Sequence, residues 1–115
     1  MWIRTTDCKE SVHLTKPLFC SYIEGEDVEE FYFDEKMAEA LENDGFLTEM
    51  WDNFNAMFDW GDCDFFPAEK CVMLKGWIEK RMSKPTNDDL KEFYTVLLQY
   101  SERAIQNDTG ISFDF

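Results

Sequence analysis

The sequence predicts a mainly α-helical fold: about four helices packed as a compact bundle, with a small sheet formed by the N- and C-terminal segments. Three observations lead to this prediction. Apolar residues recur at intervals of three and four through most of the chain after residue 33, as in amphipathic helices. Proline and capping residues divide that stretch into separate helices. Apolar and polar residues then alternate over the last five positions, as in a half-buried strand.

The length of 115 residues fits one folding unit, so residues 1–115 are expected to form a single domain. Hydrophobic residues make up 44% of the chain and aromatic residues 17%, which is enough large apolar material to fill one core. The chain is therefore expected to fold despite its high charge.

The first 23 residues are predicted to contain two short extended segments. Residues 2–3 and 18–23 are rich in aromatic and β-branched side chains, and Pro17 suits the start of a strand. One or two helical turns beginning at Pro17 are the alternative. Residues 24–30 place one glycine among acidic residues with a single apolar residue, which predicts a charged loop.

Two helices are predicted in the middle of the chain. The first begins at about Asp34, where Glu35, Glu39 and Glu42 fall off an apolar stripe, and ends at Gly45, which can adopt the left-handed conformation. The second covers residues 46–58, and its wide stripe of Met and aromatic residues predicts burial. Residues 59–64 are predicted to be a loop because Gly61 lies among alternating carboxylates.

Two further helices and a strand are predicted in the C-terminal half. Pro67 opens a helix that Pro85 ends, and Thr86 can cap the next helix, which runs to about Ile105. Residues 107–110 close that helix, and residues 111–115 alternate as a strand. A lone strand is unstable, so this one must pair with the N-terminal extended segments.

Negative charge is concentrated in one part of the sequence. The chain has 25 acidic and 11 basic residues, which gives a net charge of −14. Residues 24–64 hold 15 acidic residues and one base, Lys36, whereas residues 67–115 hold eight acidic and seven basic residues. Such polarisation is typical of a surface that attracts a basic partner, and it disfavours direct binding of nucleic acid or of an anionic membrane.

The sequence predicts a cytoplasmic protein without a membrane segment. The first residues lack the apolar core of a signal peptide, and no uncharged stretch approaches the length of a spanning helix. In a reducing compartment Cys8, Cys20, Cys63 and Cys71 are expected to be free thiols. Two disulfides, or a zinc site that includes His13, are the alternatives.

The sequence does not predict an enzyme or a cofactor. His13 has no nearby nucleophile motif and is expected to be an ordinary surface or half-buried residue. Asp59, Asp62 and Asp64 invite a Ca²⁺ or Mg²⁺ hypothesis, but their spacing does not match a calcium loop. Phosphate loops, zinc helices and nucleophile elbows are absent from the sequence.

The acidic segment therefore provides the candidate binding residues. Carboxylates steer a cationic surface toward the protein, and large aromatic side chains among them serve as anchors. A solvated helix face above core aromatics is the alternative. The predicted partner-binding residues are Glu24, Glu26, Asp27, Glu29, Glu30, Tyr32, Asp34, Asp59, Trp60, Asp62 and Asp64.

A resemblance to a known family adds to this interpretation. The residues that carry it are 65–71 (FFPAEKC), 77–81 (WIEKR), Tyr100, 104–105 (AI) and 108–115 (DTGISFDF). This pattern, over about half of the chain, resembles small immunity proteins of bacterial toxin/immunity pairs, as in contact-dependent growth inhibition. The resemblance implies a cytoplasmic protein that binds and blocks one cognate toxin domain, commonly a nuclease whose active site is basic. It implies no particular binding residues.

Two other functions remain open on the sequence. A phage-type inhibitor that mimics DNA would also be acidic, and it would compete with duplex DNA for several proteins. A metal-dependent enzyme would use Asp59, Asp62 and Asp64 as ligands. A DNA mimic should bind several DNA-binding proteins, whereas an immunity protein should bind only its cognate toxin. A metal-dependent enzyme should bind Ca²⁺, Mg²⁺ or Mn²⁺.

Overall fold

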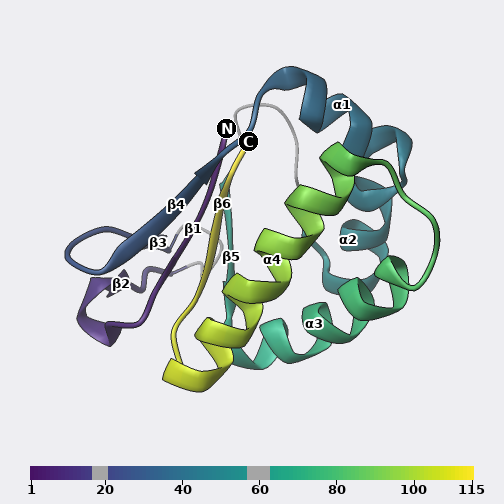
Figure 1. The fold of residues 1–115 in the computed structure, drawn as a ribbon. Coiled ribbons are helices and arrows are strands. Elements are labelled where there is room, and N and C mark those ends of the chain that lie inside the picture. Colours follow the sequence, from purple (N-terminus) through teal and green to yellow (C-terminus); the bar gives the residue numbers. More distant parts are fainter. Residues whose placement is uncertain (17–20, 57–62) are drawn as a thin grey trace.

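The computed structural model describes residues 1–16, 21–56 and 63–115, in which helices cover one face of a four-stranded antiparallel sheet (Figure 1). The elements in chain order are β1 (Trp2–Thr6), the short 3₁₀ helix η1 (Lys9–Ser11), β2 (Val12–His13), β3 (Tyr22–Ile23), β4 (Val28–Tyr32), α1 (Glu35–Asn43), α2 (Phe46–Phe54), β5 (Cys63–Pro67), α3 (Ala68–Met82), α4 (Asp88–Asn107) and β6 (Gly110–Asp114).

The fold is therefore α+β, and the prediction of a mainly α bundle is wrong. The strand order is β4-β1-β6-β5. The predicted pairing of the terminal segments exists as the central β1–β6 pair. The strands β4 and β5 flank it, and each overlaps the end of a segment predicted as a loop, residues 24–30 and 59–64. Both missed strands are edge strands, and an edge tolerates charge and proline that a central strand does not.

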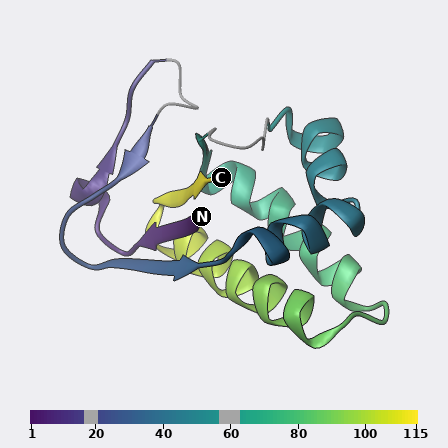
Figure 2. The same ribbon diagram turned by 90° about the horizontal axis from the view of Figure 1, so that it is seen from above.

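Side chains along β1 alternate between the two faces of the sheet, and one of these faces packs against the helices. Ile3 pairs with Phe31 on one side and Phe113 on the other. Ile3 and Phe113 are fully buried, and the Phe31 ring lies 6.3 Å from that of Phe93 on α4. Side chains at alternate positions, such as Arg4, point to the opposite face. The pair β2–β3 lies over part of that opposite face (Figure 2).

The four predicted helices are present, with bounds close to those expected. The Asp34 side chain caps α1, and Gly45 follows it with a φ of 84°. The helix α2 ends at Phe54, four residues before the predicted end, and residues 57–58 lie outside the described residues. The cap of α4 is Asn87, whose side chain accepts a bond from Leu90, and not Thr86 as predicted.

A polar cluster joins the turn between α1 and α2 to the two long helices. The Asp44 carboxylate accepts bonds from Arg81 Nη2 at 2.7 Å and Arg81 Nε at 2.9 Å. The Tyr94 hydroxyl donates to the same carboxylate at 2.6 Å. The hydrogen bonds from Arg81 lower the pKa of Asp44, and burial raises the pKa of Tyr94. The cluster therefore links the α1–α2 turn to α3 and α4, and Arg81 balances the charge of Asp44.

The described residues also answer two smaller questions. Cys8 and Cys71 are free thiols, as predicted, and burial raises the pKa of Cys71 to about 12. Cys20 and the side chain of Cys63 lie outside the described part of the chain. None of the helices in the described ranges has the length and apolar character needed to cross a membrane.

Candidate protein-binding surface

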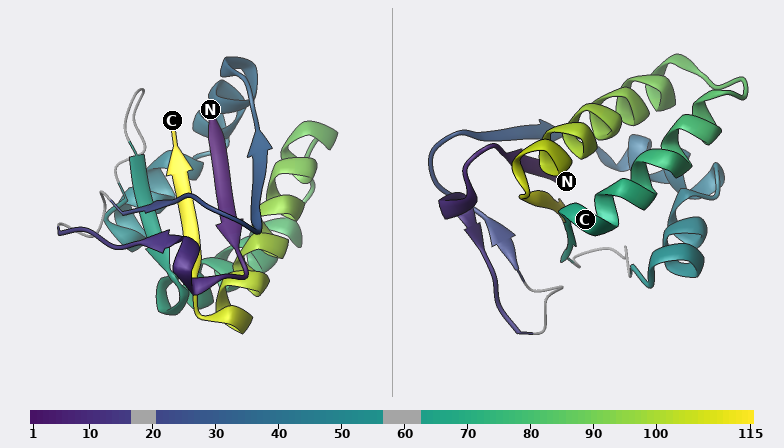
Figure 3. Two further views of the ribbon diagram at one scale, coloured as in Figure 1. Left: turned by 90° about the vertical axis from the view of Figure 1, so that its left-hand side faces the viewer. Right: turned by 90° about the horizontal axis from the view of Figure 1, so that it is seen from below.

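The strand β4 forms one edge of the sheet and leaves half of its backbone groups without a strand partner. Phe33 N donates to Met1 O at 2.9 Å, so the residue pairs 1–33, 3–31 and 5–29 are the hydrogen-bonded ones in the β1–β4 ladder. The backbone groups of Val28, Glu30 and Tyr32 therefore point away from β1. Within the described residues, no backbone or side-chain group bonds to them. Figure 3 shows β4 as the outermost strand on this side.

The side chains of β4 on the face away from the helices combine an aromatic pair with an ion pair. Tyr32 lies opposite Trp2 with ring centroids 5.1 Å apart, and 57% of Tyr32 is exposed. Glu30 lies opposite Arg4, whose Nε donates to it at 3.0 Å. Arg4 Nη1 also lies 3.8 Å from Asp114 Oδ2, so the Arg4 guanidinium is shared between the Glu30 and Asp114 carboxylates.

On the helix side of β4 a second arginine is also shared. Arg103 of α4 bonds to Asp7 through Nη2 at 2.9 Å and through Nε at 3.0 Å. The same guanidinium contacts the Glu29 carboxylate. These bonds lower the pKa of Asp7. Each face of the strand therefore keeps one negative charge in excess of its arginine.

The turn before β4 adds exposed carboxylates that make no ion pair with any described residue. Glu24, Glu26 and Asp27 are exposed. The backbone of this turn is fixed from inside, because Ser11 Oγ donates to Glu26 O at 2.8 Å and Glu24 N donates to Ser11 O at 2.9 Å. The carboxylates thus project from an ordered turn.

A groove of about 520 Å³ lies where β4 leads into α1. Phe31, Phe33, Met37 and Ala40 form its apolar lining. Asp34, Asp89 and Glu92 add carboxylates, and Lys36 adds one cation. An apolar floor with a carboxylate rim suits a long cationic side chain, whose aliphatic stem packs below while its charged head meets the rim.

Further exposed carboxylates lie beyond the groove on α1 and α2. We call the exposed carboxylates between residues 24 and 52 that make no ion pair with a described residue the acidic band. Its members are Glu24, Glu26, Asp27, Asp34, Glu35, Glu39, Glu42, Glu49 and Asp52. The band follows the chain from the turn before β4 to α2, and Lys36 is the base within that stretch.

The structure does not bring all predicted binding residues together. Asp64 is 6% exposed and lies on β5, at the edge of the sheet opposite β4. Its Oδ1 accepts a bond from Phe65 N at 2.7 Å, so it is an internal polar residue. Asp59, Trp60 and Asp62 lie outside the described residues. The predicted site is therefore described only for its first part, from Glu24 to Asp34.

The chemistry considered for His13 and for metal ions gains no support from the geometry. His13 stacks on Tyr22 with ring centroids 4.7 Å apart, and its Nε2 donates to Glu24 O at 2.8 Å. Both interactions hold the small β2–β3 sheet together. Within residues 1–16, 21–56 and 63–115, no three His, Cys, Asp or Glu side chains are grouped as metal ligands.

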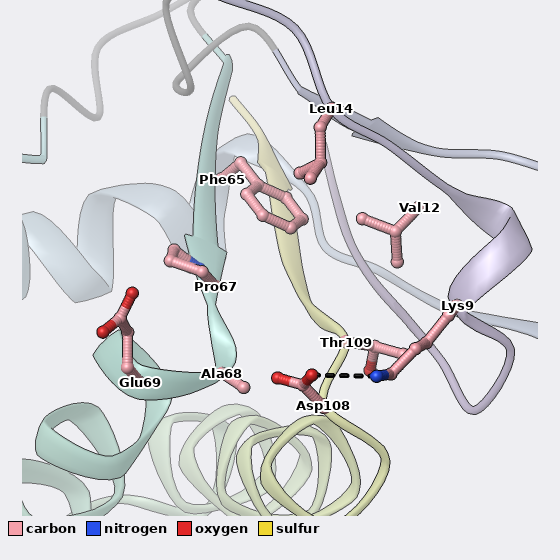
Figure 4. A pocket seen from close by; sticks show the side chains of 9 residues that line it. All are labelled: Lys9, Val12, Leu14, Phe65, Pro67, Ala68, Glu69, Asp108 and Thr109. Carbon is pink, nitrogen blue, oxygen red and sulfur yellow. Dashed lines mark ion pairs between the residues drawn. The ribbon is translucent and has the colours of Figure 1, made fainter.

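A second groove, of about 510 Å³, lies beside β5 (Figure 4). Val12, Leu14 and Phe65 face its hollow, and the ion pair between Lys9 and Asp108 at 2.9 Å closes one end. Leu14 is 67% exposed. This groove is separate from the acidic band because β5 and β4 are opposite edges of the sheet.

Sequence reasoning missed the two parts of the surface that depend on tertiary structure. Residues 28–30 belong to the segment 24–30 that the sequence predicted as a charged loop, although Val28, Phe31 and Tyr32 are strand-forming types. Asp89 and Glu92 lie on α4 and are not among the predicted binding residues. Their place in the groove depends on the packing of α4 beside α1, for which the local sequence has no signal.

Comparison of the chain with protein-family models, with curated proteins and with solved structures found no match.

Proposed function

We propose that this protein binds a basic protein partner through the acidic band and β4, and that it acts in the cytoplasm as an immunity protein that neutralises a toxin domain. The observation that carries the proposal is the acidic band, whose nine exposed carboxylates between Glu24 and Asp52 make no ion pair with a described residue. A surface of this charge raises the association rate with a cationic partner.

The mechanism follows from the chemistry of the partner. A nuclease domain holds its substrate phosphates with Lys and Arg, and carboxylates that reach those side chains occupy the position of the phosphates. Tyr32 and the groove beside it supply the apolar contact that a purely charged surface lacks. The proposed role is thus binding and occlusion, without a catalytic step.

The experiment is a growth assay with the C-terminal domain of the protein encoded immediately upstream of this chain. We expect expression of that domain alone to stop growth and co-expression with this chain to restore it. The variant Glu24→Gln/Asp27→Asn should weaken the rescue. The matched control is Glu69→Gln/Glu79→Gln, which changes two exposed carboxylates of α3 outside the band and should rescue fully.

Two results would contradict the proposal. In the first, the upstream domain is harmless, or its toxicity is unchanged by this chain. In the second, the chain competes with duplex DNA for several unrelated DNA-binding proteins, which would instead identify a DNA mimic.

A further inference from the structure

We infer that β4 accepts an additional strand from the basic partner, so that the partner extends the four-stranded sheet at this edge. The inference rests on the proposed function and specifies how the same surface binds. It commits to one occupant, an extended segment rich in Lys and Arg from another protein. Three observations lead to it.

The first observation is the backbone of β4. Val28, Glu30 and Tyr32 direct their N–H and C=O groups away from β1, and no described residue bonds to them. The exposed state of Glu30 and Tyr32 agrees with an uncovered edge. An extended peptide beside such an edge gains a ladder of main-chain hydrogen bonds, and pockets for its side chains add specificity.

The second observation is the charge on both faces of the strand. Arg4 is shared between Glu30 and Asp114, and Arg103 is shared between Glu29 and Asp7. A net negative charge therefore remains above and below the edge. Lysine and arginine side chains on either face of an added strand would meet this charge directly.

The same charge disfavours a second copy of this chain as the occupant. An antiparallel pair of two β4 strands centred on Glu30 would place Glu30 opposite its own copy and Glu26 of each copy opposite Asp34 of the other. Like charges directly opposite each other destabilise a strand pair. Acidic side chains on an edge are also a device that prevents self-association.

The third observation is the groove at the end of β4. It begins at Phe31 and Tyr32 and continues past Asp34 to Met37 and Glu92. A strand that leaves the edge at Tyr32 would enter this groove. The apolar lining and the carboxylates there fit one further cationic side chain.

The test uses a synthetic peptide of about eight residues in which lysine and valine alternate, because alternation in an added strand separates the two side-chain types onto opposite faces. A control peptide has the same sequence with every second backbone amide N-methylated, which keeps the charge and removes the hydrogen-bond donors of one edge. Affinity is measured by calorimetry, and amide hydrogen exchange is followed residue by residue.

We expect the control peptide to bind at least about tenfold more weakly, since two or three backbone hydrogen bonds are lost at about 1 kcal/mol each. Saturation with the unmodified peptide should slow exchange of the Glu30 and Tyr32 amides by about tenfold or more. The amides of Glu29 and Phe31 already bond to β1 and should change little.

Two variants of Tyr32 test whether its outward backbone N–H contributes to peptide binding. Tyr32→Pro removes the ring and the outward N–H, whereas Tyr32→Ala removes only the ring. Proline is tolerated at an edge position whose N–H faces solvent. We expect the proline variant to bind the peptide several-fold more weakly than the alanine variant, with circular dichroism confirming that both are folded. If the proline variant fails to fold, the exchange measurement alone decides.

The outcomes separate this inference from the proposed function. Equal, salt-sensitive binding of both peptides would overturn strand addition and leave the acidic band as a binding surface. Absence of binding by either peptide would overturn strand addition, while the growth assay would still decide the function. Protection of Glu30 and Tyr32 without peptide, together with a dimer in sedimentation, would make a second copy the occupant.

Discussion

At the scale of single residues, the contacts of Asp44 show how one side chain connects three helices. Its carboxylate takes three hydrogen bonds from Arg81 and Tyr94, and only 16% of the Asp44 side chain is exposed. Hydrogen bonds to a charged group contribute more to stability than neutral ones. Asp44 was predicted only as part of a turn, because its partners are 37 and 50 residues away in the sequence.

The substitution Asp44→Asn is expected to lower the free energy of unfolding at neutral pH by about 2 kcal/mol. The pKa of Asp44 in the folded chain lies below its ordinary value of 3.8. The carboxylate therefore stabilises the fold above that value, and this contribution is lost as the pH falls through the lower folded-state pKa. Urea unfolding of both proteins at several pH values should show a difference that shrinks below pH 3.8. A difference that does not depend on pH would contradict this account.

Replacing two glycines by alanine is expected to change the stability of the protein in opposite directions. A Cβ at Gly110 would lie 2.5 Å from Phe65 Cζ and 2.6 Å from Phe66 O, whereas a Cβ at Gly76 meets nothing within 4 Å. We expect Gly110→Ala to destabilise the protein by about 1–3 kcal/mol through overpacking between β5 and β6. Gly76→Ala, inside α3, should stabilise it by about 0.5–1 kcal/mol. Thermal unfolding of both variants checks the signs, and a neutral Gly110→Ala would show that the strands can separate at little cost.

Residue patterns predicted the apolar core better than the polar interior. Cys71, Leu74, Ile78, Ile111 and Phe113 are buried as their spacing predicted. Asp64 was read as an exposed carboxylate because three aspartates occur in a short segment beside Gly61. It is buried beside Phe65 and Phe66 instead. A polar residue inside is satisfied by specific partners, and sequence spacing does not reveal those partners.

At the scale of elements, the helices followed from the sequence, whereas the two edge strands of the four-stranded sheet did not. The helices are 9 to 20 residues long, so each contains several turns of the apolar period. The missed strands β4 and β5 have five residues each and lie at the sheet edges. An edge strand needs only one apolar face and tolerates charge, so its pattern resembles that of a loop.

The start of α4 gives a prediction for one element. Asn87 Oδ1 accepts a bond from Leu90 N at 2.8 Å, and α4 packs against both α3 and the sheet. We expect Asn87→Ala to lower the free energy of unfolding by about 1 kcal/mol, because a backbone donor at the helix start loses its partner. Lys91→Ala, one turn later and exposed, is the control. Equal effects of the two substitutions in denaturant unfolding would argue against the cap.

At the scale of the whole molecule, the polarised charge of the sequence lies on exposed carboxylates that extend from the turn before β4 to α2 of an α+β fold. The sequence predicted a binding surface within residues 24–64; in the described part of that stretch most carboxylates up to Asp52 are exposed, whereas Asp44 is half-buried and Asp64 is buried. The composition does not predict the edge strand β4, which lies within the same segment of the chain. That edge arises only when residues 28–32 pair with β1, a contact between distant parts of the chain.

The measurement that tests the acidic band most directly is the association rate, as a function of salt, with the domain encoded upstream that we propose to be the toxin. Between about 50 mM and 500 mM salt, screening should lower the rate at least tenfold. At low salt, Glu24→Gln/Asp27→Asn should bind several-fold more slowly, whereas Glu69→Gln/Glu79→Gln should match the unmodified protein. A rate that is independent of salt, or an equal loss in both variants, would contradict the account.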